Sequence, residues 1–162
     1  MSSILTLQRR AIAALIDSMT IAGGYNNDWN TINNRNYSIG PFPRAEIYSV
    51  EERNMDTLAG IGSGDYTNEV DWEIHIINKM QTSATNPIFD IQDLEDAMID
   101  DMKRLFGAID NRSVSGTVDS FLYKGFRREI VSTDQFTPRK IITKWTSTYS
   151  QDRVDPTQYA SS

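Results

Sequence analysis

The chain has 162 residues, 39% of them hydrophobic and 23% charged, and it contains no cysteine. This length fits one domain, and the lack of cysteine excludes a disulfide scaffold, a thiolate zinc site and a cysteine nucleophile. With 16 Lys and Arg against 22 Asp and Glu, the net charge is −6, which argues against a protein that holds nucleic acid mainly by its phosphates. We expect a soluble protein, because no apolar run approaches the ~18 residues that span a bilayer.

The first element is predicted to be a helix over residues 3–20. Its apolar side chains recur at helical spacing, and Gly23 and Gly24 follow as residues that commonly end a helix. Residues 25–42 are predicted to form a surface loop, because residues 25–38 are rich in Asn, which favours turns.

Two strands are predicted next. Residues 44–51 alternate apolar and polar side chains, residues 52–66 form a surface connection with several glycines, and residues 66–80 give the clearest strand. In the second strand Val70, Trp72 and Ile74 alternate with charged residues, which indicates one buried and one exposed face.

Residues 90–109 are predicted to form a second amphipathic helix with Asp90 as its N-cap. Its apolar stripe has steps of three and four: Ile91, Leu94, Met98, Met102, Leu105 and Ile109. Asp93, Asp96 and Asp100 lie on the opposite side, so we interpret the acidic cluster as a solvated face rather than a metal site.

Residues 118–132 and 139–150 are predicted to form two closing strands, with a bulge or a close backbone approach at Gly125. Residues 151–162 are predicted to be a polar C-terminal arm. We therefore expect an α+β domain over residues 1–150 in the order α-β-β-α-β-β, with a mainly antiparallel four-stranded sheet and two helices on one face.

We find no residues that support an enzyme, a cofactor or a metal site. His75 is the only histidine, and its place on the polar side of a strand indicates a solvent-facing residue. Residues 60–64, Gly-Ile-Gly-Ser-Gly, lie between two predicted strands and lack the Lys-Ser or Lys-Thr of a phosphate loop. Lys124, Arg127 and Arg128, with neighbouring aromatic residues, raise nucleic-acid binding as an alternative.

The order of the landmarks carries a family resemblance. After the first helix and a strand introduced by proline come the glycine-rich segment, the EVDWEIHI strand (69–76) and the DLEDAMIDDMKRLF helix (93–106), followed by FRREIV (126–131) and KIITKWTSTY (140–149). This order resembles the tail terminator, or tail-completion, proteins of long-tailed bacteriophages.

The resemblance implies a structural virion protein, assembled in the host cytoplasm, that forms a hexameric ring at the head-proximal end of the tail tube. The implied partners are the tube protein, the neck or stopper protein and, as a further candidate, the sheath protein. DNA would pass through the ring without being specifically bound, and no membrane is involved.

Two contacts are expected on this basis. Gly60, Ile61, Gly62, Ser63 and Gly64 would touch the tube or neck. Acidic and basic surfaces on neighbouring subunits would meet in a head-to-tail contact, and the residues expected there are Asp93, Asp96, Asp100, Arg127, Arg128 and Lys144.

Three other interpretations remain open. Another neck or stopper protein would have the same size and acidity. A nucleic-acid-binding module would show salt-sensitive binding through Arg127, Arg128 and Lys144. A hydrolase that uses the acidic cluster would need a metal and Asp100.

Overall fold

The computed structural model describes residues 2–31, 41–55, 65–78, 87–129, 139–152 and 157–159, with the side chains of 65–66 and 87–90 left out. The elements, in order, are α1 (Ile4–Asp17), β1 (Arg44–Asn54), β2 (Asp65–Asn78), α2 (Pro87–Gly107), the 3-10 turn η1 (Ile109–Asn111), β3 (Ser120–Arg128) and β4 (Arg139–Asp152). The predicted α+β fold and its element order are confirmed.

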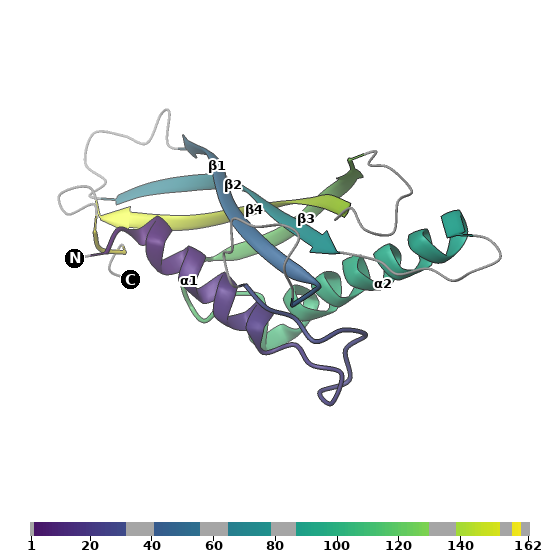
Figure 1. The fold of residues 1–162 in the computed structure, drawn as a ribbon. Helices are drawn as coiled ribbons and strands as arrows, with labels where there is room; N and C mark the ends of the chain where they lie inside the picture. Colours follow the sequence, from purple (N-terminus) through teal and green to yellow (C-terminus); the bar gives the residue numbers. More distant parts are fainter. Residues whose placement is uncertain are drawn as a thin grey trace.

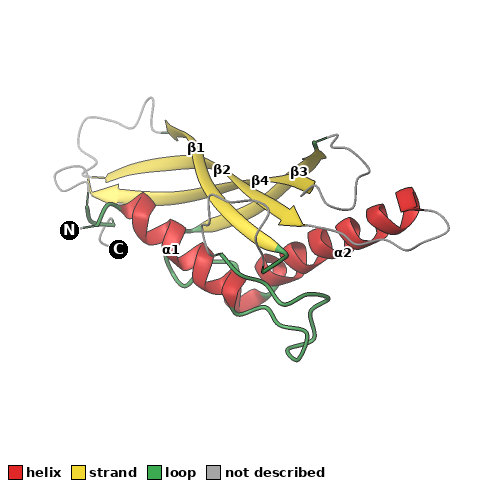
Figure 2. Ribbon diagram, viewed as in Figure 1, coloured by secondary structure: helices red, strands yellow, loops and turns green. Residues whose placement is uncertain are grey.

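The four strands form one antiparallel sheet in the order β1-β2-β4-β3. Both helices lie on the same face of this sheet, so the molecule has one helical layer and one sheet layer (Figures 1 and 2). The predicted bulge at Gly125 is confirmed: the register between β3 and β4 shifts there, and Gly125 has φ +132°. A second shift, between Ser49 and Glu51, bends β1.

Helix α1 begins where the sequence predicted and ends earlier. The Ser3 hydroxyl accepts a hydrogen bond from the backbone N–H of Thr6, which caps the first turn. The helix ends at Asp17 rather than Thr20, because both the backbone N–H and the hydroxyl of Ser18 bond to the Leu15 carbonyl. Ile12 and Ile16 are fully buried against the sheet.

Helix α2 starts at Pro87, so Asp90 lies within the helix and the predicted N-cap is wrong. Proline is well suited to the first turn, where its missing N–H has no helical partner to lose. The helix ends at Gly107, and Ile109 is 80% exposed in η1. Leu94 is also exposed, at 46%. The buried stripe follows the 3.6-residue period instead and consists of Ile91, Met98, Ile99, Met102, Leu105 and Phe106.

Aromatic rings join the two layers. The Trp145 ring of β4 stacks on Phe121 of β3 with 5.1 Å between ring centroids, and Phe106 of α2 meets Trp145 edge-on at 5.0 Å. Tyr123 meets the same indole at 5.1 Å. Because the buried faces of α2, β3 and β4 converge on one ring, Trp145 lies at the centre of the interlayer packing.

The C-terminal segment differs from the predicted arm over residues 151–162. β4 continues through Asp152, and Tyr159 pairs with Gln151 in an isolated antiparallel bridge. The Tyr159 ring lies 6.1 Å from that of Tyr149, and burial raises the pKa of both phenols. The described part of the C-terminal segment therefore packs against the sheet.

Candidate functional site: the outer face of the sheet

The face of the sheet turned away from the helices is the candidate site, and we call it the outer face (Figure 2). Strand alternation places Val70, Trp72 and Ile74 toward the helices, as predicted, and all three are buried. The intervening residues of β2 face outward, among them Glu69, Asp71 and Glu73. The outer face is therefore mainly polar along the middle of β2.

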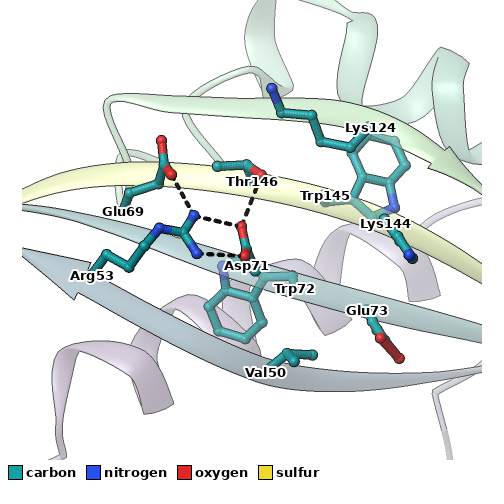
Figure 3. Close-up of a pocket in the computed structure, with 10 residues that line it drawn as sticks. All are labelled: Val50, Arg53, Glu69, Asp71, Trp72, Glu73, Lys124, Lys144, Trp145 and Thr146. Atoms are coloured by element: carbon teal, nitrogen blue, oxygen red, sulfur yellow. Dashed lines mark hydrogen bonds and ion pairs between the residues drawn. The ribbon is translucent and has the colours of Figure 1, made fainter.

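A groove of about 460 Å³ crosses this face (Figure 3). Arg53 of β1 reaches over β2, and its guanidinium donates to both carboxylate oxygens of Asp71, at 2.7 and 3.0 Å, and to Glu69. Thr146 of β4 donates a further bond to Asp71. These bonds hold the pKa of the Asp71 carboxyl below its usual range, mainly through Arg53, and raise that of Arg53.

Two lysines line the other side of the groove. Lys144 lies opposite Glu73 in the β2–β4 register, and Lys124 extends from the bulge of β3 (Figure 3). Neither ammonium forms an ion pair, with nitrogen and oxygen within 4 Å, with a carboxylate of any residue that the structure describes. The groove can therefore accept carboxylates or other anions beside Lys124 and Lys144, while Arg53 is already bonded to Asp71 and Glu69.

The place of His75 corrects the sequence interpretation. Its side chain is 12% exposed rather than solvent-facing. The imidazole lies 4.5 Å from the Tyr48 ring, and its Nε2 is 3.0 Å from a Glu73 oxygen. Tyr48 in turn donates to Glu46 at 2.6 Å. Neighbours on β1 cover the ring, which alternation along β2 alone does not reveal.

The acidic helix and the basic hairpin contact each other within one chain. Arg128 donates to Glu95 at 2.7 Å and to Asp96 at 2.5 Å, and Arg139 donates to the other Glu95 oxygen at 2.7 Å. Of the residues predicted to join subunits, Asp96 and Arg128 are therefore bonded to each other. Asp93 and Asp100 are exposed on α2, while Arg127 and Lys144 are exposed on the outer face.

One buried carboxylate was not recognised from the sequence as an anchor. Asp101 is fully buried and accepts hydrogen bonds from the backbone and side-chain amides of Asn26 and Asn27 and from the Trp29 indole. It fixes the start of the Asn-rich segment to α2. Its position one residue from the exposed Asp100 gives no local signal, because the partners lie more than 70 residues away in the sequence.

Several large apolar side chains are exposed at the two edges of the sheet. On β1 the exposed fractions are 43% for Tyr48 and 57% for Val50, and on β3 they are 54% for Leu122 and 42% for Phe126. By register, Leu122 lies on the outer face opposite Thr146, and Phe126 lies on the helical side opposite Thr143. Contiguous exposed apolar patches are typical of contact surfaces, and here the edge of β3 exposes one large apolar residue on each of its faces. These edges lie next to the groove.

The remaining predicted contact lies outside the described residues. Gly60, Ile61, Gly62, Ser63 and Gly64, and the part of the Asn-rich loop after Thr31, fall in ranges that the structure does not describe. Within the described ranges, no group of three or more His, Asp or Glu side chains is arranged to hold a metal ion, and no helix is long and apolar enough to cross a membrane.

Comparison with known proteins places the chain in no family. No protein-family model matches it, and no curated protein matches it at a significant level. The geometry of the sheet and its surface therefore carries the functional argument.

Proposed function

We propose that this chain is a structural virion protein of the tail-terminator kind. Its copies form a ring, with six subunits as the expected number, that caps the head-proximal end of a tail tube and joins it to the neck. Its partners are further copies of itself, the tube protein and the neck or stopper protein, with the sheath protein as another candidate. The role is structural rather than catalytic.

The observation that carries the proposal is the exposure of apolar side chains on both edges of the sheet. Val50 lies on one edge, and Leu122 and Phe126 lie on the other. A ring requires two different contact surfaces on each subunit, because a head-to-tail contact that repeats by rotation closes on itself. Two separate adhesive edges meet this requirement, and a single patch would favour a dimer.

The charge of the chain also supports a part that surrounds DNA without holding it. The net charge of −6 repels phosphates at long range. The exposed basic residues on the outer face favour one alternative, a nucleic-acid-binding module that uses Lys124, Arg127 and Lys144. A neck or stopper protein is the other alternative, and it differs from the terminator only in its partner.

Native mass spectrometry over a wide range of protein concentrations, with negative-stain electron microscopy of the same samples, tests the proposal. We expect a closed ring with a central opening, populated at high concentration or when tube protein is added. Binding to the tube or to the neck protein separates the terminator from the stopper.

A strictly monomeric chain at every concentration, with or without tube protein, contradicts the proposal. Salt-sensitive binding of duplex DNA that is lost in Arg127→Glu/Lys144→Glu favours the nucleic-acid module instead. Asp93→Lys is the matched control, because it changes an exposed charge on the helical layer.

A further inference from the structure

We propose that copies of this chain join edge to edge, with β3 of one copy pairing antiparallel to β1 of the next, so that one sheet continues around the ring. This inference rests on the proposed function and specifies its self-contact. It concerns the two outer strands, which have no described strand beyond them apart from an isolated parallel bridge between Asn30 and Arg44 at the start of β1.

Backbone groups on both outer strands point away from the rest of the sheet. Ala45 of β1 donates its N–H away from β2, to the Asn30 carbonyl, so strand alternation directs the backbone groups of Ile47 and Ser49 away from β2 as well. Glu129 donates its N–H toward β4, to Lys140, which turns the backbone groups of Phe126 and Arg128 outward. Each edge therefore offers a row of donors and acceptors to an added strand.

The directions of the two outer strands also fit this contact. All neighbours in the order β1-β2-β4-β3 are antiparallel, so β1 and β3 run in opposite directions within one chain. Rotation about an axis along the strands preserves these directions. It therefore brings β3 of one copy against β1 of the next as an antiparallel pair, and the alternation of the sheet continues across the junction.

The exposed charges on the two outer strands have opposite signs. β3 carries three basic residues, Lys124, Arg127 and Arg128, and no acidic residue; Arg128 is bonded to Glu95 and Asp96 of its own chain, so Lys124 and Arg127 are the cations that this edge offers. The exposed end of β1 carries Glu51 and Glu52. A β3–β3 or β1–β1 dimer would bring like charges together, whereas β3 against β1 places cations beside carboxylates.

The apolar side chains complete the match. Val50 lies beside the two glutamates on β1, and on β3 Leu122 precedes the basic segment while Phe126 lies within it. Natural sheets usually protect long exposed edges with charges, bulges or covering segments. Here each edge combines exposed apolar residues with charged ones, and the charge is basic on β3 and acidic on β1. This combination fits a second copy of the chain as the occupant.

The absence of cysteine from the natural sequence makes disulfide crosslinking a clean test. One cysteine is placed on each edge, Glu51→Cys or Val50→Cys on β1 with Leu122→Cys or Lys124→Cys on β3, in all four combinations. Under mild oxidation we expect at least one combination to give a ladder of covalent oligomers that ends in a closed ring. Arg10→Cys/Asp110→Cys, with one cysteine on α1 and the other on η1, is the control and should give no ladder.

A charge swap tests the same junction without crosslinking. Glu51→Lys and Lys124→Glu should each raise the protein concentration needed for ring formation about tenfold or more, and the double variant should recover most of that loss. Asp110→Lys, an exposed reversal on η1, should change nothing. Circular dichroism and the unfolding midpoint confirm that each variant is folded.

The outcomes separate this inference from the proposed function. If the unmodified chain forms rings but no cysteine pair crosslinks the edges, or the double charge swap restores nothing, the edge contact is overturned. The proposed ring itself would then still stand. Crosslinked dimers formed by a single-cysteine variant indicate like-edge pairing and also overturn it. No ring of the unmodified chain overturns the proposed function itself.

Discussion

The two faces of the sheet come from the same strands, yet they put charged residues to different uses. On the helical side, Glu95 and Asp101 are buried and fully bonded by partners distant in the sequence. On the outer face, Lys124 and Lys144 stand beside a carboxylate–arginine cluster without ion pairs to described residues. The helical side uses charge to fix the fold, whereas the outer face leaves the charges of Lys124 and Lys144 exposed.

The largest expected effect breaks the helical side at its aromatic centre. Trp145→Ala removes the ring that packs against Phe106, Phe121 and Tyr123, and we expect it to lower the free energy of unfolding by about 3–5 kcal/mol. Denaturant unfolding at a concentration where the chain is monomeric measures this loss. Ile109→Ala, at an exposed position, is the control and should stay within about 0.5 kcal/mol. Equal losses in both variants would contradict the assigned core.

The next effect compares two adjacent aspartates on α2. Asp101→Ala leaves the amides of Asn26 and Asn27 and the Trp29 indole without their acceptor, which we expect to cost about 3 kcal/mol of unfolding free energy. Asp100→Ala has the same change in helix propensity at an exposed site and should cost less than about 0.5 kcal/mol. Hydrogen exchange at residues 26–29 should speed up only in the first variant.

A smaller effect separates Glu95 from Asp96. Glu95→Ala leaves Arg128 and Arg139 without a buried carboxylate that both now contact, and we expect a loss of about 2 kcal/mol in stability. Asp96→Ala removes only an exposed partner of Arg128 and should cost less than about 1 kcal/mol. Similar losses in the two variants would mean that the exposed Asp96 contributes as much as the buried Glu95 to holding Arg128.

The smallest expected effect lies on the outer face and appears as a dependence on pH. Arg53 lowers the pKa of Asp71 in the folded chain, so the unfolded chain takes up this proton first as the pH falls. The stabilisation is complete above the unfolded pKa of about 4 and is lost as the pH falls through the lower folded value.

Asp71→Asn should therefore flatten the acid side of the stability profile and lower stability at neutral pH only by the modest amount that acid removes from the unmodified chain through this carboxyl. Denaturant midpoints measured from neutral to acidic pH test this expectation. Glu51→Gln, at a more exposed partner of Arg53, is the matched control and should retain most of the acid dependence. A large loss at neutral pH in Asp71→Asn would show that the outer cluster holds the fold rather than merely lining its surface.

Local patterns account for the elements that were predicted correctly. Alternation of apolar residues located β2 and β4, helical spacing located both helices, and Gly125 marked the bulge in β3. The boundaries were less accurate, because the end of α1 depends on the bonds of Ser18 and the start of α2 on Pro87. Such ends are set by single side-chain or backbone contacts that periodicity does not encode.

The candidate site was only partly predictable for the same reason. The sequence identified Arg127 and Lys144 as basic surface residues, but it also grouped Asp96 with Arg128 as a contact between subunits, and the structure bonds these two within one chain. The groove formed by Arg53, Asp71 and Lys144 was not anticipated, because its residues come from three strands. Their proximity depends on the register between β1, β2 and β4.

The sequence by itself determined the fold class and element order of this protein, because hydrophobic periodicity within each segment is a local property. Only the tertiary structure decided which charges are buried, which are paired and which are exposed. Asp100 and Asp101 are neighbours in the chain, yet one is exposed and the other fully buried. The difference arises because the environment of a carboxylate is set by residues that folding brings to it from distant parts of the sequence.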